Sequence, residues 1–120
     1  MKNILLVEDE EMLVNVLATV LEDEGYKVCK SMSAEEALST VSEFKPDLII
    51  SDVKLPQKDG FTMLRELKND TTVSAVPFIC LTALDDTQTQ QKAKTLGAAA
   101  YMTKPFDVDD LVKLVRQVLL

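Results

Sequence analysis

Four short apolar runs of this chain each end on a side chain that suits phosphate or metal chemistry. The runs cover residues 4–7, 48–51, 78–81 and 98–103, and the residues at their ends are Glu8 and Asp9, Asp52, Thr82 and Lys104. If the runs are parallel strands of one sheet, their carboxyl ends lie along one edge with neighbours ~5 Å apart. Three carboxylates, a hydroxyl and an ammonium would then meet in one crevice. The sequence therefore predicts a site for a hard cation and a phosphoryl group.

Each of these residues also has an ordinary explanation when it is considered alone. Glu8 and Asp9 are typical acids before a helix, threonine is common in strands, and lysine is common at strand ends. Asp52 is harder to explain in this way, because it lies too far from the Asp59-Gly60 turn to belong to it. Folding alone gives no reason for four strand ends to present suitable groups, so their coincidence favours a functional site.

The rest of the chain predicts the elements that would hold this site. Short apolar runs alternate with longer segments whose apolar residues recur at helical spacing, as in repeated strand–helix units around a parallel sheet. A fifth strand is expected at residues 27–30. The run at 48–51 lacks polar alternation, so helices are expected on both faces of the sheet. The predicted fold is α/β, a single doubly wound five-stranded parallel sheet with five flanking helices.

The predicted helices differ in the strength of their apolar stripes and caps. The first is expected to end at Gly25, and the second to begin with a capping box formed by Ser33 and Glu36. Asp107 is expected to cap the last helix. The fourth helix, at about 85–96, has little apolar stripe and is predicted to be mobile. The expected stripe of the first helix consists of Leu13, Val16, Leu17, Val20 and Leu21.

Composition and charge limit the class of protein. A chain of 120 residues with 47% hydrophobic content is expected to form one domain over residues 1–120. The net charge of −7 argues against nucleic acid and anionic membranes as direct partners and favours basic partner surfaces. No apolar run is long enough for a membrane-spanning helix, and none resembles a signal peptide. Cys29 and Cys80 fall in apolar runs and form no CxxC motif, so buried reduced thiols and a cytoplasmic location are expected.

Missing residue types exclude several kinds of site. The chain contains no histidine, which rules out a Ser-His-Asp triad, a histidine-bound zinc and a phosphohistidine within it. The three glycines, at 25, 60 and 97, form neither a GxGxxG nor a Walker loop. Any phosphate site must therefore use side chains and loop amides.

Taken in their order along the chain, the motifs resemble those of a receiver domain of the two-component response-regulator family. The resemblance covers essentially the whole chain. The motifs are the acidic pair Glu8-Asp9, the run DxxxPxxDG from Asp52 to Gly60, Thr82-Ala83, and Lys104-Pro105-Phe106. The resemblance implies the flavodoxin-like strand order 2-1-3-4-5. It also implies a cis Lys104-Pro105 peptide bond.

The resemblance implies a role for each site residue. Asp52 would be the phosphoacceptor, and Lys104 and Thr82 would contact the phosphoryl oxygens. Thr82 and Tyr101 would form the switch that remodels the face made by helix four, strand five and helix five. The expected cofactor is Mg²⁺, with Mn²⁺ as the alternative. Its expected ligands are Glu8, Asp9, Asp52 and the backbone carbonyl of Lys54.

The resemblance also implies the partners. A sensor histidine kinase or histidine phosphotransfer protein would supply the phosphoryl group, and an effector protein or output domain would respond. The domain is expected to be a monomer or a phosphorylation-promoted dimer, and not an enzyme beyond self-phosphorylation and autodephosphorylation. The chain departs from the usual pattern of the family at two positions. Glu8 stands where many relatives have aspartate, and Lys54 places a cation beside the acidic pocket.

Three interpretations remain open from the sequence. The first is a phosphorylation-controlled module, expected to be stand-alone because the chain begins at Met1, although a piece of a larger transcriptional regulator or hybrid kinase would look the same. The second is a receiver-fold interaction domain that acts without phosphorylation. The third is an independent magnesium phosphohydrolase, which the absence of a substrate-covering insertion disfavours.

Overall fold

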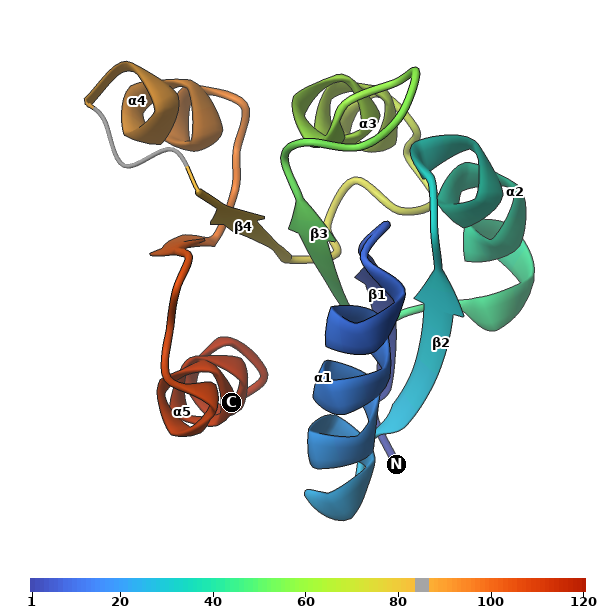
Figure 1. The fold of residues 1–120 in the computed structure, drawn as a ribbon. Coiled ribbons are helices and arrows are strands. Elements are labelled where there is room, and N and C mark those ends of the chain that lie inside the picture. Colours follow the sequence, from blue (N-terminus) through green and yellow to red (C-terminus); the bar gives the residue numbers. More distant parts are fainter. Residues whose placement is uncertain (84–86) are drawn as a thin grey trace.

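The computed structural model describes residues 1–83 and 87–120, which form one five-stranded parallel sheet with helices on both faces (Figure 1). The strand order is β2-β1-β3-β4-β5, as predicted. The strands are β1 (Asn3–Val7), β2 (Lys27–Ser31), β3 (Leu48–Asp52), β4 (Phe78–Thr82) and β5 (Ala100–Thr103). The helices are α1 (Glu11–Asp23), α2 (Ala34–Phe44), α3 (Gly60–Lys68), α4 (Thr87–Thr95) and α5 (Val108–Val118).

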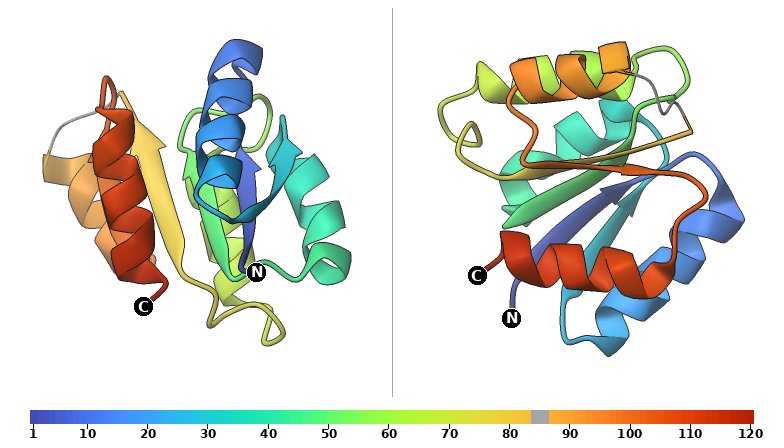
Figure 2. Two further views of the ribbon diagram at one scale, coloured as in Figure 1. Left: turned by 90° about the horizontal axis from the view of Figure 1, so that it is seen from below. Right: turned by 90° about the vertical axis from the view of Figure 1, so that its left-hand side faces the viewer.

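The sheet separates two apolar cores. Successive strand side chains point to opposite faces, so Leu5 packs in one core and Leu6 in the other. One core is shared with α2, α3 and α4, and the other with α1 and α5. Figure 2 shows these helices as two layers on either side of the sheet. The central strands β3 and β4 are fully buried, in agreement with their continuous apolar sequence.

Helix α1 buries a different stripe from the predicted one. Its buried residues are Val14, Leu17, Ala18 and Leu21, which follow i, i+3, i+4, i+7 spacing. Leu13 and Val20 lie at the margins of this stripe and are half-buried. The prediction was wrong for Val16, whose side chain is 51% exposed. Position 16 lies two residues from Val14 and Ala18, so it turns away from the sheet even though the residue is apolar.

The helix caps largely follow the sequence. The Ser33 hydroxyl accepts a hydrogen bond from the Glu36 N–H at 3.1 Å, and the Asp107 side chain accepts one from the Asp109 N–H at 2.8 Å. The reciprocal half of the predicted capping box is displaced by one residue, because the Glu36 carboxylate accepts from the Met32 N–H at 3.4 Å. Both helices therefore begin at the predicted places.

The segment from α4 to β5 is less deeply packed than the rest. Ala93 is the buried residue of α4, so the weak apolar stripe is confirmed, whereas mobility of the helix stays a prediction. The predicted start of the helix at residue 85 lies outside the described residues. Strand β5 begins at Ala100 and not at Ala98, because the chain leaves Gly97 with a positive φ of 93° and needs two residues to join the sheet.

The two cysteines are free and differ in burial. Cys80 lies in the centre of β4, and burial raises the pKa of its thiol to about 12. Cys29 is only half-buried, in contrast to the prediction, because β2 is an edge strand. Among the described residues, no helix is both long and apolar enough to span a membrane.

The packing of α1 can be tested with neighbouring substitutions. Leu17→Ala should lower the free energy of unfolding by about 2–5 kcal/mol, because Leu17 is fully buried and leaves a cavity. Val16→Ala should change it by less than about 0.5 kcal/mol. Urea denaturation measures both values, and equal losses for the two variants would contradict the observed orientation of the helix.

Candidate functional site

The predicted site residues meet at the carboxyl edge of the sheet. Glu8 follows β1, Asp52 ends β3 and Lys104 follows β5. Thr82 ends β4, one residue after Leu81, the register partner of Asp52. The ends of these strands are level, because Val7 pairs with Ser51 and Thr82 with Thr103.

A single ammonium group joins two of the carboxylates. The Nζ of Lys104 lies 2.7 Å from Glu8 Oε1 and 2.7 Å from Asp52 Oδ2. The side chains of Glu8, Asp52 and Lys104 are 1%, 10% and 20% exposed. The contact between Lys104 and Glu8 was not predicted from the sequence, which assigned these residues to phosphate and metal separately.

Burial and pairing have opposite effects on these groups. Burial raises the pKa of Glu8, while hydrogen bonds from the Lys104 ammonium and the Glu10 N–H act in the other direction without cancelling the shift. For Lys104, burial lowers the pKa, but hydrogen bonds and charge from Asp52 and Glu8 outweigh it, so the pKa is raised. Lys104 is therefore a stable cation between two acids at neutral pH.

Backbone contacts fix the position of Asp52. Its Oδ1 accepts a hydrogen bond from the Lys54 N–H at 3.1 Å. Gly60 packs directly against the same segment: a Cβ at this position would lie 2.3 Å from the Asp52 carbonyl oxygen, and the Gly60 N–H donates to Val53 O at 2.8 Å. From the sequence, Gly60 was predicted to form a turn with Asp59 and to end the DxxxPxxDG run. The nine residues from Asp52 to Gly60 indicated a loop that turns back at Gly60. They did not indicate how closely Gly60 approaches the carbonyl oxygen of Asp52.

The acidic residues form a candidate metal centre. Glu8, Asp9 and Asp52 each have a carboxylate oxygen within 4.8 Å of the others. A set of carboxylate oxygens fits a hard cation such as Mg²⁺ better than a soft one. Asp9 is exposed, whereas Glu8 and Asp52 are buried. The Lys54 carbonyl ligand stays a prediction from the resemblance.

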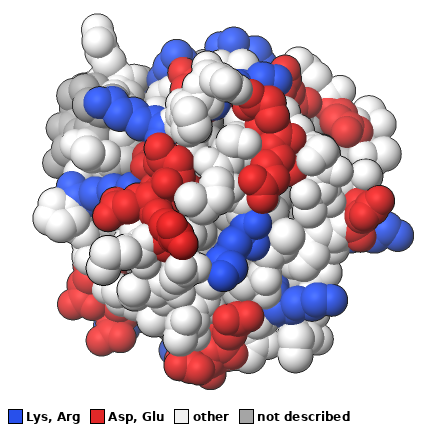
Figure 3. Space-filling model, turned by 45° about the vertical axis from the view of Figure 1, so that its right-hand side comes forward, with Lys and Arg blue, Asp and Glu red and all other residues white. Residues whose placement is uncertain are grey.

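The candidate metal centre differs from the other acidic groups of the molecule mainly in its burial. Acidic side chains occur in several groups on the face shown in Figure 3, with basic side chains between them. Solvated acids of this kind agree with the net charge of −7 and need no ligand. Glu8 and Asp52 differ because the fold removes both from water beside a cation.

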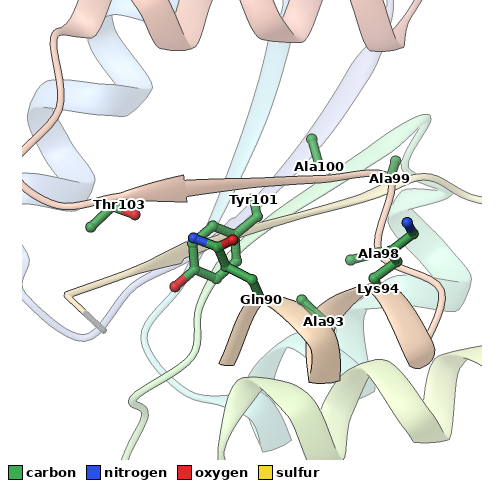
Figure 4. Close-up of a pocket in the computed structure, with 8 residues that line it drawn as sticks. All are labelled: Gln90, Ala93, Lys94, Ala98, Ala99, Ala100, Tyr101 and Thr103. Carbon is green, nitrogen blue, oxygen red and sulfur yellow. The ribbon is translucent and has the colours of Figure 1, made fainter. Parts of the chain in front are cut away.

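The two predicted switch residues lie on neighbouring strands. Thr82 is fully buried, and its carbonyl accepts a hydrogen bond from the Lys104 N–H at 2.7 Å. Tyr101 is half-buried on β5, and it borders the same hollow as Gln90 of α4 (Figure 4). The peptide bond between Lys104 and Pro105 is cis, as predicted.

Two hollows flank the site. One of about 560 Å³ is bordered by Asp9 and the loop that follows β3. The other, of about 400 Å³, includes Lys104 and Ala83 in its wall. Its remaining lining residues are Glu10, Leu13, Pro105, Phe106 and Val108. Asp9 and Lys104 thus each border a surface depression.

The family model for the response regulator receiver domain matches residues 4–116. The chain belongs to this family. Residues 4–116 include every motif on which the resemblance was based, so the predicted family is confirmed. The receiver domain is a signalling domain of two-component systems and not a classical enzyme.

Similar proteins differ in length. Protein PilH of Pseudomonas aeruginosa is 33% identical over 119 residues, with 99% of this chain and 98% of that protein covered. The alkaline phosphatase synthesis transcriptional regulatory protein PhoP of Bacillus subtilis is 39% identical over 118 residues, which cover 98% of this chain but 48% of PhoP. This chain spans about half the length of several of the curated relatives it matches.

Solved structures agree with the fold. The chemotaxis response regulator CheY4 of Vibrio cholerae superposes with a TM-score of 0.93 at 29% identity, covering 99% of both chains. The non-phosphorylated HemR receiver domain of Leptospira biflexa superposes with a TM-score of 0.91 at 30% identity, covering 99% of this chain and 94% of that one. The predicted flavodoxin-like topology is confirmed.

The ion pair of Lys104 should stabilise the fold measurably. Lys104→Met is expected to lower the free energy of unfolding at neutral pH by about 3 kcal/mol, because it leaves buried carboxylates without a cation. Lys58→Met is the matched control, since Lys58 pairs with Glu66 at the surface and should cost less than about 1 kcal/mol. Denaturant unfolding of both variants measures the difference.

The loss of stability expected for Lys104→Met should be smaller in mild acid than at neutral pH. Without Lys104, burial of Glu8 acts with less opposition, so its pKa in the folded variant lies above the ordinary value of 4.5. The folded state then binds a proton more readily than the unfolded state, and stability increases as the pH falls through that window. A loss for Lys104→Met that stays constant from neutral pH to about pH 5 would contradict this account.

Proposed function

We propose that this receiver domain is a switch that accepts a phosphoryl group on Asp52. The observation that carries the proposal is the buried Asp52 carboxylate, held 2.7 Å from the Lys104 ammonium beside two further acids. The phosphodonor would be the phosphohistidine of a sensor histidine kinase or of a histidine phosphotransfer protein. The hollow that has Lys104 in its wall supports an approach of that donor between α1 and the segment after β5.

In the proposed reaction, an oxygen of Asp52 attacks the phosphorus atom while the bond between phosphorus and the donor imidazole nitrogen breaks. The phosphoryl group passes to Asp52, and the imidazole leaves with the electron pair of the broken bond and is then protonated from solvent. A carboxylate is a weak nucleophile, but a loose transition state depends mainly on alignment and charge neutralisation. The Lys54 N–H holds one oxygen of Asp52 and so supports that alignment.

Lys104 and Thr82 are proposed to hold the transferred group. The Lys104 ammonium already contacts Asp52 and can donate to a phosphoryl oxygen from the same place. Thr82 ends the adjacent strand, so its hydroxyl is proposed to donate to another phosphoryl oxygen. Ala83 follows it with a small, exposed side chain, which leaves room for the group.

Glu8, Asp9, Asp52 and the Lys54 carbonyl are the proposed ligands of Mg²⁺, with Mn²⁺ as the alternative. When bound, the divalent cation would offset negative charge on the phosphoryl oxygens. The carboxylate set supports this assignment because one ammonium pairs with only two of the three clustered acids, which leaves an excess of negative charge in the site.

The proposed output is a change at the surface formed by α4, β5 and α5. Thr82 and Tyr101 are the proposed switch residues, since they lie on adjacent strands between the site and this surface. The shallow packing of α4 supports its role as the responsive element. A change from mostly inactive to mostly active requires a preference of about 5.5 kcal/mol for the active state on phosphorylation.

The proposed partners follow from the family. Residues 1–120 would act as one receiver domain that controls a separate effector protein or an attached output domain, as a monomer or a phosphorylation-promoted dimer. Relatives of both lengths, PilH and PhoP, support either arrangement. The net charge of −7 supports a domain that does not itself bind nucleic acid. Free cysteines agree with the cytoplasmic location that we propose.

Intact-mass spectrometry tests the phosphoacceptor. After incubation with a magnesium salt and acetyl phosphate, the wild type should gain one phosphoryl group and Asp52→Asn none. Asp59→Asn is the control: Asp59 lies in the same loop and caps α3, a role that asparagine also fills, so this variant should be phosphorylated normally. No addition to the wild type, even with a cognate kinase, would overturn the proposal in favour of a phosphate-independent interaction domain.

Thermal unfolding tests the metal ligands. Magnesium chloride should raise the unfolding temperature of the wild type, because a ligand that binds only the folded state stabilises it. Asp9→Asn should weaken magnesium binding by about tenfold, or about 1.4 kcal/mol. Glu11→Gln removes an exposed acid two residues away and should leave the magnesium effect unchanged. Equal responses of the two variants would argue against Asp9 as a ligand.

A further inference from the structure

A hollow of about 400 Å³ lies at the amino edge of the sheet, at the opposite end of the strands from Asp52. We call it the amino-edge hollow. It lies between the end of α2 and the segment that joins α3 to β4. Its lining residues Pro46 and Val76 each stand two residues before a strand, β3 and β4 respectively. Its volume lies in the usual range of small-molecule sites.

The floor of the amino-edge hollow is apolar and continuous with a core of the domain. Val41 and Val73 belong to the buried core that is shared with α2, α3 and α4, and Val76 packs against that core. Pro46 is also buried. A ligand that covers this floor removes apolar surface from water, which favours binding of an apolar body.

The charged residue of the amino-edge hollow is a lysine. Lys45 is exposed, and within residues 1–83 and 87–120 its ammonium forms no ion pair. Two acids that are close in sequence to lining residues have partners elsewhere: Asp47 accepts a hydrogen bond from the Asn3 N–H at 2.7 Å, and Asp70 accepts one from the Thr72 hydroxyl at 2.7 Å. In the described part of the chain, no acidic residue lines this hollow.

The backbone of Lys45 is unusual for a lysine. Lys45 ends α2 in the left-handed conformation, with a φ of 53°, where helices most often have glycine or asparagine. A side chain with a Cβ is unfavourable in this conformation, although a cation at a helix C-terminus is favourable. The conformation therefore supports a binding role for Lys45 only together with the hollow that its side chain borders.

The two hollows that flank the functional site are less suitable for an anion. The Lys104 ammonium in the wall of one already pairs with two carboxylates. The other is lined by two acids, Asp9 and Asp59. The amino-edge hollow combines a cation that is available to a ligand with a lining that carries no acid.

We propose that the amino-edge hollow binds a small monocarboxylate with an aliphatic or aromatic body. The body rests on the three valines and Pro46, and the carboxylate pairs with the Lys45 ammonium. The exposed Ser42 hydroxyl donates a hydrogen bond to the same carboxylate. A single carboxylate matches a lining with one cation, whereas a polyanion would be repelled by the net charge of −7. The inference does not depend on the proposed switch, because the two sites share no residue.

Hydrocinnamate, a phenyl ring joined to a carboxylate by two methylene groups, is the probe, and its amide is the neutral control of the same shape. Both are titrated against the intact chain and followed by backbone amide chemical shifts. We expect saturable shifts in residues 41–45 and 72–76, a Kd at least about tenfold weaker for the amide, and weaker hydrocinnamate binding at high salt. No saturable shifts in these segments, or equal binding of the amide, would overturn the proposal.

Matched variants separate Lys45 from the general charge of the domain. Lys45→Asn removes the cation, and asparagine tolerates the left-handed conformation, so the unfolding temperature should change little. Hydrocinnamate binding should weaken by at least about tenfold. Lys2→Asn makes the same charge change at an exposed position of the same sheet edge and should bind as the wild type does. Undiminished binding by Lys45→Asn, or an equal loss in both variants, would overturn the assignment to this hollow.

Two further results would place the ligand or the occupant elsewhere. Shifts centred on Lys104 and not on Lys45 would put the carboxylate at the phosphoacceptor site and overturn the proposal. Self-association in sedimentation that Lys45→Asn abolishes would make a second copy of the chain the occupant, and the proposal would be wrong. Asp52→Asn should bind hydrocinnamate as the wild type does, because Asp52 lies at the other end of the strands. Hydrocinnamate binding by a wild type that cannot be phosphorylated rejects only the proposed switch.

Discussion

The ammonium of Lys104 contacts two carboxylates, those of Glu8 and Asp52, that the fold removes from water. The desolvation of a buried charge costs several kcal/mol, and the Lys104 ammonium, 2.7 Å from both Glu8 and Asp52, offsets part of that cost. The three residues come from three strands, so their contact requires the complete sheet with its strand ends level. The site is therefore complete only when β1, β3 and β5 lie in one sheet.

Contacts on several sides hold Asp52 in one position. Its carboxylate is held by Lys104 and by the Lys54 N–H, while its carbonyl is in close contact with Gly60. The closeness of Gly60 fixes the path of the loop between β3 and α3, and with it the position of the Lys54 backbone. A residue that carries no functional group thus determines where two functional groups lie.

Much of the fold could be predicted from the sequence, because apolar periodicity and turn residues determine helices, strands and turns. Both involve residues that are close together along the chain. The strand order was available only through the resemblance, since periodicity alone does not say which strands are adjacent. The exposed Val16 shows another limit: an apolar residue can fall within a helical stripe by spacing and still face solvent, because tertiary contacts select the stripe. For the site, the strand ends predicted which residues meet. The contact of Lys104 with Glu8 and the close approach of Gly60 depend on distances that spacing does not encode.

The division of the interior into two cores has a consequence for how such a domain can diversify. The helices α1 and α5 pack on one face of the sheet and α2, α3 and α4 on the other, with β3 and β4 fully buried between them. A substitution that reshapes one layer is thus insulated from the other by the rigid strands. The α1/α5 layer and the α2/α3/α4 layer can therefore accumulate core substitutions independently, while the residues at the sheet edge stay the same.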